Sequence, residues 1–169
     1  MRDKSWNGYE RNRLLINMGD GTFAEAATAY GLDSLRDGRG LAVSDFDGDG
    51  GLDFMINNYN GPAQYFVNKV PQRGHWLRIR LRGRQSNRDG IGAILRATTG
   101  NKKQMRVISA GDGYASQYSR IAHFGLGNAK TIDTLEVTWP SGHQQTFHNV
   151  AVDRLIEVDE NRPAPITIR

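Results

Sequence analysis

The chain has 169 residues, of which 38% are hydrophobic and 24% charged, and its formal net charge is +4. This length predicts one domain or two small ones, and the 20 glycines favour turn-rich β structure over a disordered chain. The absence of cysteine excludes disulfides, thiolate metal sites and cysteine nucleophiles. A small charge excess without a recognisable binding motif predicts no nucleic-acid partner. No apolar run approaches the roughly 20 residues of a spanning helix, so we expect a soluble protein without a membrane span.

The first elements expected along the chain are short strands. Residues 13–23 read as a hairpin around a Gly-Asp-Gly turn. A short helical turn is expected over residues 23–32, where apolar side chains share one face and Gly31 follows. Alternating apolar residues then predict two strands, at 38–46 and 52–59, with an acidic loop between them. The segments "RLLIN" and "QYFVN" form a partial internal repeat with the spacing of propeller blades.

Four carboxylates crowd the loop "DFDGDGGLD" that joins these two strands. Like charges about 4 Å apart repel by roughly 1 kcal/mol per pair even in water, so a cation is expected inside the loop. Counted from Asp45, side-chain oxygens fall at positions 1, 3, 5 and 9, with glycine at 6 and a backbone carbonyl at 7, which is how a loop surrounds a hard cation. The predicted calcium ligands are the side chains of Asp45, Asp47, Asp49 and Asp53 and the carbonyl of Gly51.

Three alternatives to this calcium site were weighed. Magnesium demands near-octahedral geometry and tends to keep its waters, which suits the loop less well. An EF-hand would place a bidentate Glu at position 12, where this chain has Ile56, and Ile56 alternates with Leu52 and Phe54 as in a strand. An Asx-rich turn that holds no metal stays open, because Asp and Gly are turn residues in any case.

Proline, glycine and charge interrupt the apolar pattern between Asn68 and His75, where we place a domain boundary. Short strands separated by turns follow, without long helices, as in an antiparallel sandwich or barrel. We predict an all-β fold in which a partial propeller-like blade with a calcium loop packs on an antiparallel β-sandwich. The predicted regions are the blade over 1–70, the sandwich over 71–160 and a tail over 161–169.

A row of arginines marks the first strand of the predicted sandwich. Because alternate residues share a face, the arginines point one way while Leu77, Ile79 and Leu81 face the core. The arginine face is either a solvated surface that resists aggregation or a stripe that binds polyanions such as sulfated glycans. The residues concerned are Arg78, Arg80, Arg82 and Arg84.

Two stretches carry a family resemblance. The segments "NRLLINMGDGTF" and "GRGLAVSDFDGDGGLDFMINNYNGPAQYFVN" resemble an FG-GAP/VCBS-type repeat, the calcium-loop blade of integrin-alpha-like propellers. The motifs "SNRDGIGA", "HFGLG" and "WPSG" resemble an ASPIC/UnbV domain, as in the cartilage acidic protein-like family. The resemblance implies a secreted or cell-surface, calcium-stabilised, non-enzymatic adhesion module, with the metal role on the four loop aspartates. Only one calcium loop is present where the family usually has several repeats.

Three functional hypotheses follow. The first is an extracellular calcium-binding structural or adhesion module that contacts a protein partner or copies of itself, since unpaired blade edges invite strand addition. The second is a carbohydrate- or polyanion-binding module of a secreted protein, which exposure of Trp139 beside Tyr118 would favour. The third is an enzyme of unidentified chemistry, although the chain has no G-x-S-x-G or H-E-x-x-H motif.

Overall fold

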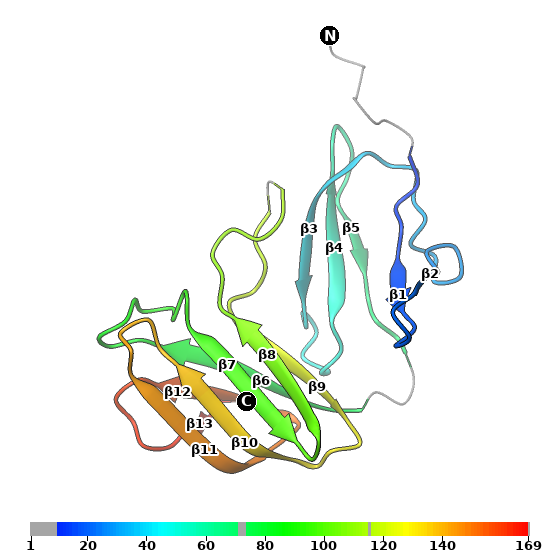
Figure 1. Ribbon diagram of the computed structural model, residues 1–169. Coiled ribbons are helices and arrows are strands. Elements are labelled where there is room, and N and C mark those ends of the chain that lie inside the picture. Colours follow the sequence, from blue (N-terminus) through cyan, green and yellow to red (C-terminus); the bar gives the residue numbers. More distant parts are fainter. Residues whose placement is uncertain (1–9, 71–73, 115, 169) are drawn as a thin grey trace.

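The structure is a computed structural model that describes residues 10–70, 74–114 and 116–168. Within these ranges the chain forms thirteen β-strands in four sheets and no helix (Figure 1). The prediction of an all-β fold is therefore confirmed. The same ranges accordingly offer no helical segment long and apolar enough to cross a bilayer.

The hairpin expected near the N-terminus is present. It consists of β1 (Leu15–Asn17) and β2 (Phe23–Glu25), paired antiparallel. The helical turn expected over 23–32 is wrong in its extent, because Phe23 belongs to β2 and is exposed. The N–H groups of Tyr30, Gly31 and Leu32 bond the carbonyls of Ala26, Thr28 and Ala27, which makes one isolated turn there. One turn does not nucleate a helix, since it fixes several residues for one hydrogen bond.

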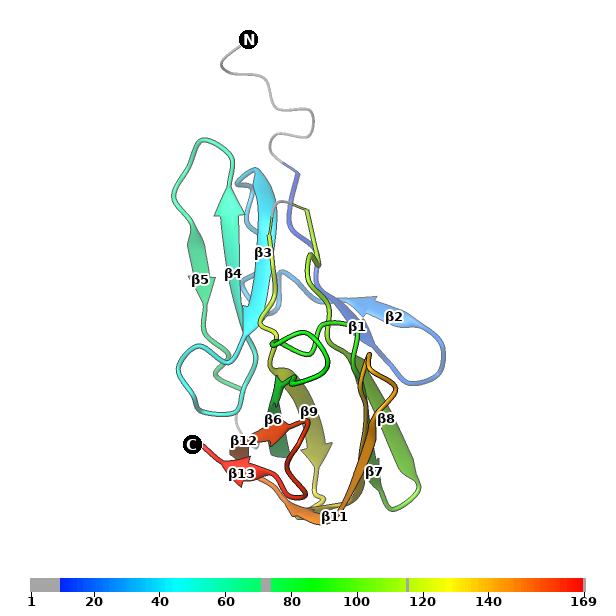
Figure 2. The ribbon, with the colours of Figure 1, turned by 90° about the vertical axis from the view of Figure 1, so that its left-hand side faces the viewer.

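The next three strands form a blade-like antiparallel sheet in the order β3-β4-β5. These strands are β3 (Gly38–Ser44), β4 (Asp53–Asn58) and β5 (Gln64–Phe66). Ser44 pairs with Asp53, so residues 45–52 form the hairpin loop of this sheet. Figures 1 and 2 show this loop at the end of the sheet nearest the sandwich.

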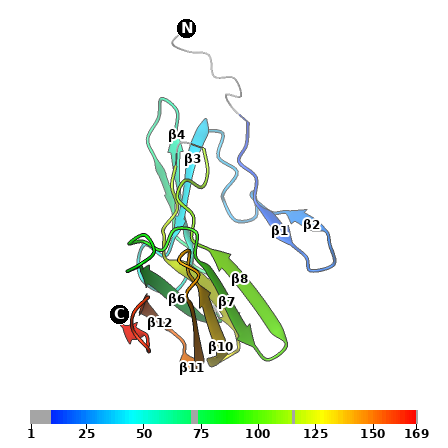
Figure 3. The same cartoon turned by 60° about the vertical axis from the view of Figure 1, so that its left-hand side comes forward.

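The remaining strands form a sandwich of two sheets, in the orders β11-β10-β7-β8 and β13-β12-β6-β9. Figure 3 shows the β1–β2 hairpin standing apart from this sandwich. One pair, β6 with β12, is parallel, whereas the other pairs described in the sandwich are antiparallel. The strands are β6 (His75–Arg82), β7 (Ile94–Thr99), β8 (Lys102–Val107), β9 (Ala122–Gly127), β10 (Thr131–Thr138), β11 (Gln144–Ala151), β12 (Arg154–Asp159) and β13 (Ile166–Thr167).

The hydrophobic core lies between the two sheets of the sandwich. Alternate residues of each strand point inward, as the period of two requires. Arg78 and Arg80 of β6 face away from this core, as predicted. The largest fully buried apolar side chains are Trp139, Phe124, Leu77, Ile79, Leu95, Ile132, Leu135, Val137 and Val158.

Two features concern the predicted domain bounds. The boundary between residues 70 and 71 adjoins residues 71–73, which lie outside the described residues. In the predicted tail, β13 (Ile166–Thr167) pairs with β12 and extends one sheet of the sandwich at its edge. Part of the tail is therefore an edge strand.

Candidate metal centre

The candidate centre is the hairpin loop between β3 and β4. Two of its glycines have left-handed backbones, Gly48 with φ of 80° and Gly50 with φ of 89°. This conformation is strained for residues with a Cβ. Gly50 is the sharp-turn glycine that the loop spacing requires at position 6, and it lets the chain fold back over its own aspartates.

Three of the predicted ligands meet in this loop. Asp45, Asp47 and Asp49 each offer a carboxylate oxygen, and these three oxygens lie within 4.8 Å of one another. Asp45 is buried, while Asp47 and Asp49 are exposed. Gly51, whose carbonyl is the predicted backbone ligand, is buried in the same loop.

Backbone amides of the loop hold these carboxylates in place. Asp45 accepts N–H bonds from Gly48 at 2.6 Å and from Gly50 at 3.1 Å. Asp49 accepts an N–H bond from Gly51 at 2.9 Å. These are the local bonds of an Asx-rich turn, so the loop closes through them in the structure as described. An ionised carboxylate has about four acceptor positions, which leaves capacity for a cation.

Asp53 lies outside the group of three. It is fully buried at the start of β4, where Oδ1 accepts the N–H of Asn68 at 2.8 Å. Its Oδ2 accepts the N–H of Phe46 at 3.1 Å and the hydroxyl of Tyr65 at 3.0 Å. Asp53 therefore ties the base of the loop to the chain around β5, and its ligand role stays a prediction.

The negative charge of the loop affects the pKa of the Tyr65 hydroxyl. Desolvation, the hydrogen bond to Asp53, and the nearby carboxylates of Asp47 and Asp49 together raise the pKa of Tyr65 to about 12. Each of these effects disfavours the phenolate. The neutral hydroxyl is thus kept as the donor to Asp53.

A cation from the sandwich contacts the loop. The Arg78 guanidinium on β6 donates to Asp45 Oδ2 at 2.7 Å. The Arg78 side chain is partly buried, at 11% exposed, and the Asp45 side chain is fully buried, at 0%. Next to it on β6, the Trp76 indole packs against Gly50, because a Cβ at Gly50 would lie 2.0 Å from Trp76 Nε1. The loop is thereby fastened to the sandwich, a contact that the sequence did not reveal.

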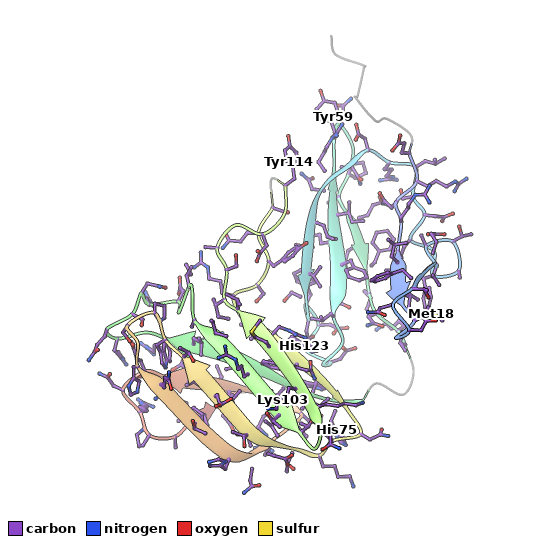
Figure 4. The ribbon with its side chains drawn as sticks, viewed as in Figure 1. Met18, Tyr59, His75, Lys103, Tyr114 and His123 are labelled. Carbon is purple, nitrogen blue, oxygen red and sulfur yellow. The ribbon has the colours of Figure 1, made fainter. Side chains whose placement is uncertain are left out.

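His123 lies beneath this junction. Figure 4 places it between the sandwich and the β3–β4 loop. Its ring stacks on Trp76, with centroids 6.4 Å apart and an angle of 10° between the rings. Burial, followed by the charge of Arg78, lowers the pKa of His123, so the neutral ring is favoured. Its buried Nδ1 has no hydrogen-bond partner among the residues that the structure describes.

The donor atoms of the loop suit a divalent cation. Arg78 pairs with Asp45, and Lys69 lies 3.9 Å from Asp47 with a side chain 75% exposed. The carboxylates of Asp47 and Asp49 are exposed. Carboxylate and carbonyl oxygens are the donors that calcium prefers. The residues present therefore fit a calcium ion in donor type.

The predicted arginine stripe is interrupted by ion pairs. Arg78 pairs with Asp45, as described. Arg82 lies 3.6 Å from Glu157, and Arg84, beyond the end of β6, lies 2.7 Å from Asp159. The four arginines therefore do not form one uninterrupted cationic stripe.

The aromatic residues do not form the sugar-binding surface that was considered. Trp139 is 2% exposed, and its Nε1 donates to Gln145 Oε1 at 2.8 Å. Tyr118 is partly buried. Tyr114, 76% exposed, lies on the long loop between β8 and β9 (Figure 4). A sugar platform that combines Trp139 with Tyr118 is therefore excluded.

Two families of known proteins match separate segments of the chain. Residues 3–56, which include the four aspartates and Gly51, match the family of FG-GAP-like repeats. Residues 83–165 match the ASPIC and UnbV family. An FG-GAP-like repeat is thus followed by an ASPIC/UnbV domain.

Longer proteins are similar to this chain in sequence. The chain is 37% identical to cartilage acidic protein 1 of Xenopus tropicalis over 114 residues, which is 64% of this chain and 18% of the relative. It is 32% identical over 145 residues to the proteins of that name from Homo sapiens and Mus musculus, covering 84% of this chain and 22% of each relative. The chain therefore spans about a fifth of the length of these relatives.

Two motifs of the ASPIC/UnbV domain meet at one carboxylate. Glu160 Oε2 accepts the backbone N–H groups of Arg84, Gln85 and Ser86 at 2.5, 2.7 and 2.9 Å. Its Oε1 accepts the hydroxyls of Ser86 at 2.8 Å and Ser141 at 2.6 Å. Ser86 opens the "SNRDGIGA" motif and Ser141 belongs to "WPSG". The motifs thus have a structural role that their spacing alone did not show.

Proposed function

We propose that this chain is a calcium-binding, non-enzymatic module of an extracellular protein, which makes structural or adhesive contacts. The observation that carries the proposal is the meeting of three aspartate oxygens within 4.8 Å in a loop held against the sandwich by Arg78. The similarity to cartilage acidic protein 1 supports the extracellular setting. The domain division proposed with it is a blade over 1–70, a sandwich over 71–160 and a tail over 161–169.

In this proposal calcium acts as a structural ion. Bound by Asp45, Asp47 and Asp49, with Asp53 and the Gly51 carbonyl as further predicted ligands, it removes the repulsion among the carboxylates. Asp45 would then contact the ion and Arg78 at once. The orientation of the β3-β4-β5 sheet on the sandwich would be fixed, so a binding surface that includes both would keep its geometry.

The test is calcium binding by the purified chain, measured by isothermal titration calorimetry and by thermal unfolding in EDTA and in calcium. With a Kd near 0.1 mM, calcium at ten times that concentration stabilises the fold by about 1.4 kcal/mol. Asp47→Asn combined with Asp49→Asn should abolish the gain.

Asp20→Asn is the matched control. Asp20 lies in the β1–β2 turn, where it accepts bonds from Thr22 instead of joining the group of three. This variant should respond to calcium as the unaltered chain does. Equal melting temperatures in EDTA and in millimolar calcium would remove the metal from the proposal.

A further inference from the structure

A second concentration of charge lines a cavity of about 340 Å³ beside the β6–β12 pair. None of its lining residues belongs to the aspartate group of the metal loop. Six of them are charged: Arg80, Arg82, Arg88, Arg120, Asp89 and Glu157.

Four separate parts of the sandwich bring these side chains together. Arg80 and Arg82 lie on the face of β6 that points away from the core, and Glu157 of β12 is the register partner of Arg80. Arg88 comes from the loop after β6, and Arg120 from the residues just before β9. Since β6 with its following loop, the segment before β9 and β12 are distant in sequence, only the folded sandwich creates this cavity.

The charges in the cavity do not balance. Arg82 pairs loosely with Glu157, at 3.6 Å, and Arg120 pairs with Asp89. The side chains of Arg80 and Arg88 make no hydrogen bond or ion pair with residues that the structure describes. Four guanidinium groups therefore face two carboxylates, and two positive charges remain without a counter-charge. Such a grouping repels itself unless an anion is near.

We propose that this cavity binds a doubly charged oxyanion group, a sulfate or a phosphate. A guanidinium presents its N–H donors in a planar fork that matches the oxygens of such groups, so arginine is well suited to recognise them. The volume lies at the small end of the range of about 300–1,000 Å³ found for ligand pockets, which suits a single substituted sugar or a free ion. The site differs from the arginine stripe considered above, because it uses Arg88 and Arg120 and omits Arg78 and Arg84.

The experiment measures binding to the calcium-free chain, so that it does not depend on the metal loop. Calorimetric titrations with sodium sulfate and sodium phosphate are compared with sodium chloride at equal ionic strength. A third arm uses a sulfated tetrasaccharide derived from heparin. We expect sulfate or phosphate to give a saturable heat of binding that exceeds the heat measured with chloride. Tighter binding of the tetrasaccharide would identify a sulfated sugar as the source of the group, and tighter binding of the inorganic ions would identify a free oxyanion.

Two variants locate the site. Arg80→Gln and Arg88→Gln each remove an unpaired guanidinium and should weaken binding about tenfold. Arg96→Gln removes an exposed arginine of β7 outside the cavity and should bind as the unaltered chain does. Circular dichroism of each variant confirms the fold. The proposal is overturned if the unaltered chain gives only the chloride response, or if Arg96→Gln weakens binding as much as Arg88→Gln.

Discussion

The carboxylate of Glu160 shows how one residue organises a region. Its side chain is buried, so desolvation alone would raise the pKa, but the hydrogen bonds from Ser141, Arg84 and Ser86 outweigh this and lower the pKa of Glu160 to about 2. The ordinary value is 4.5. The ionised group therefore favours folding at neutral pH.

Glu160→Gln should lower the free energy of unfolding at pH 7 by roughly 2–4 kcal/mol, because an amide has one accepting oxygen for the five donors that bond the two oxygens of the buried Glu160 carboxylate. The folded-state pKa lies below the unfolded one, so the contribution of Glu160 is fully present above pH 4.5 and is lost as the pH falls through about 2. Urea unfolding from pH 7 to pH 2 checks both points. The variant should show a smaller acid-side slope than the unaltered chain, whereas Glu136→Gln, at an exposed site on β10, should keep the full slope.

Gly50 gives a second prediction at this scale. Gly50→Ala adds a Cβ at a backbone φ of 89° and only 2.0 Å from Trp76 Nε1. We expect a loss of stability of about 2–4 kcal/mol from backbone strain and overpacking. Thermal unfolding measures the loss. Gly19→Ala, also at positive φ but with nothing within 4 Å of its Cβ, should cost about 1 kcal/mol. Equal losses of stability in Gly50→Ala and Gly19→Ala would show that a Cβ at Gly50 does not clash with Trp76.

Among the elements, the contact between the β3–β4 loop and β6 determines how the blade meets the sandwich. Arg78→Gln leaves the Asp45 carboxylate buried without its cation, which should cost about 3–5 kcal/mol in calcium-free protein. Asp45→Asn in that background should recover part of the loss. A double-mutant cycle from urea unfolding measures the coupling, and strictly additive effects would mean that the pair does not join the two units. Arg80→Gln, on the same strand face, is the control.

Sequence patterns predicted the local elements better than their contacts. The alternation of Leu77, Ile79 and Leu81 identified β6 and its buried face, and the aspartate spacing identified the loop that brings three carboxylates together. No local pattern indicated that Arg78 would face Asp45, or that β6 would pair in parallel with β12. These contacts depend on how distant segments dock, and a two-residue period records only which face of a strand is apolar.

At the scale of the whole molecule, the blade carries many exposed large apolar side chains. Exposed large apolar side chains gather in the β1 to β5 part of the chain, and exposed apolar patches mark interaction sites. They fit a protein partner or a second copy of the chain. The residues are Leu15, Met18, Phe23, Tyr30, Leu35, Leu41, Phe46, Met55, Tyr59, Tyr65, Val67 and Val70.

We therefore expect concentration-dependent self-association in calcium, measured by sedimentation velocity. Met55→Lys places a charge on the exposed face of β4 and should shift the distribution toward the monomer. Met105→Lys is the matched control, since Met105 is 54% exposed on β8 of the sandwich. A monomer at every concentration, with or without calcium, would contradict self-association.

The parallel pairing of β6 with β12 also bears on how the molecule is made. Leu77 of β6 lies opposite Arg154 of β12, near the other end of the sandwich sequence. At a synthesis rate of about 5–20 residues per second, β12 leaves the ribosome several seconds after β6. One hydrogen-bonding edge of β6 remains unpaired throughout that interval, and closing so long a loop makes folding slow. The nascent sandwich thus depends on protection from aggregation until its last long strand has emerged.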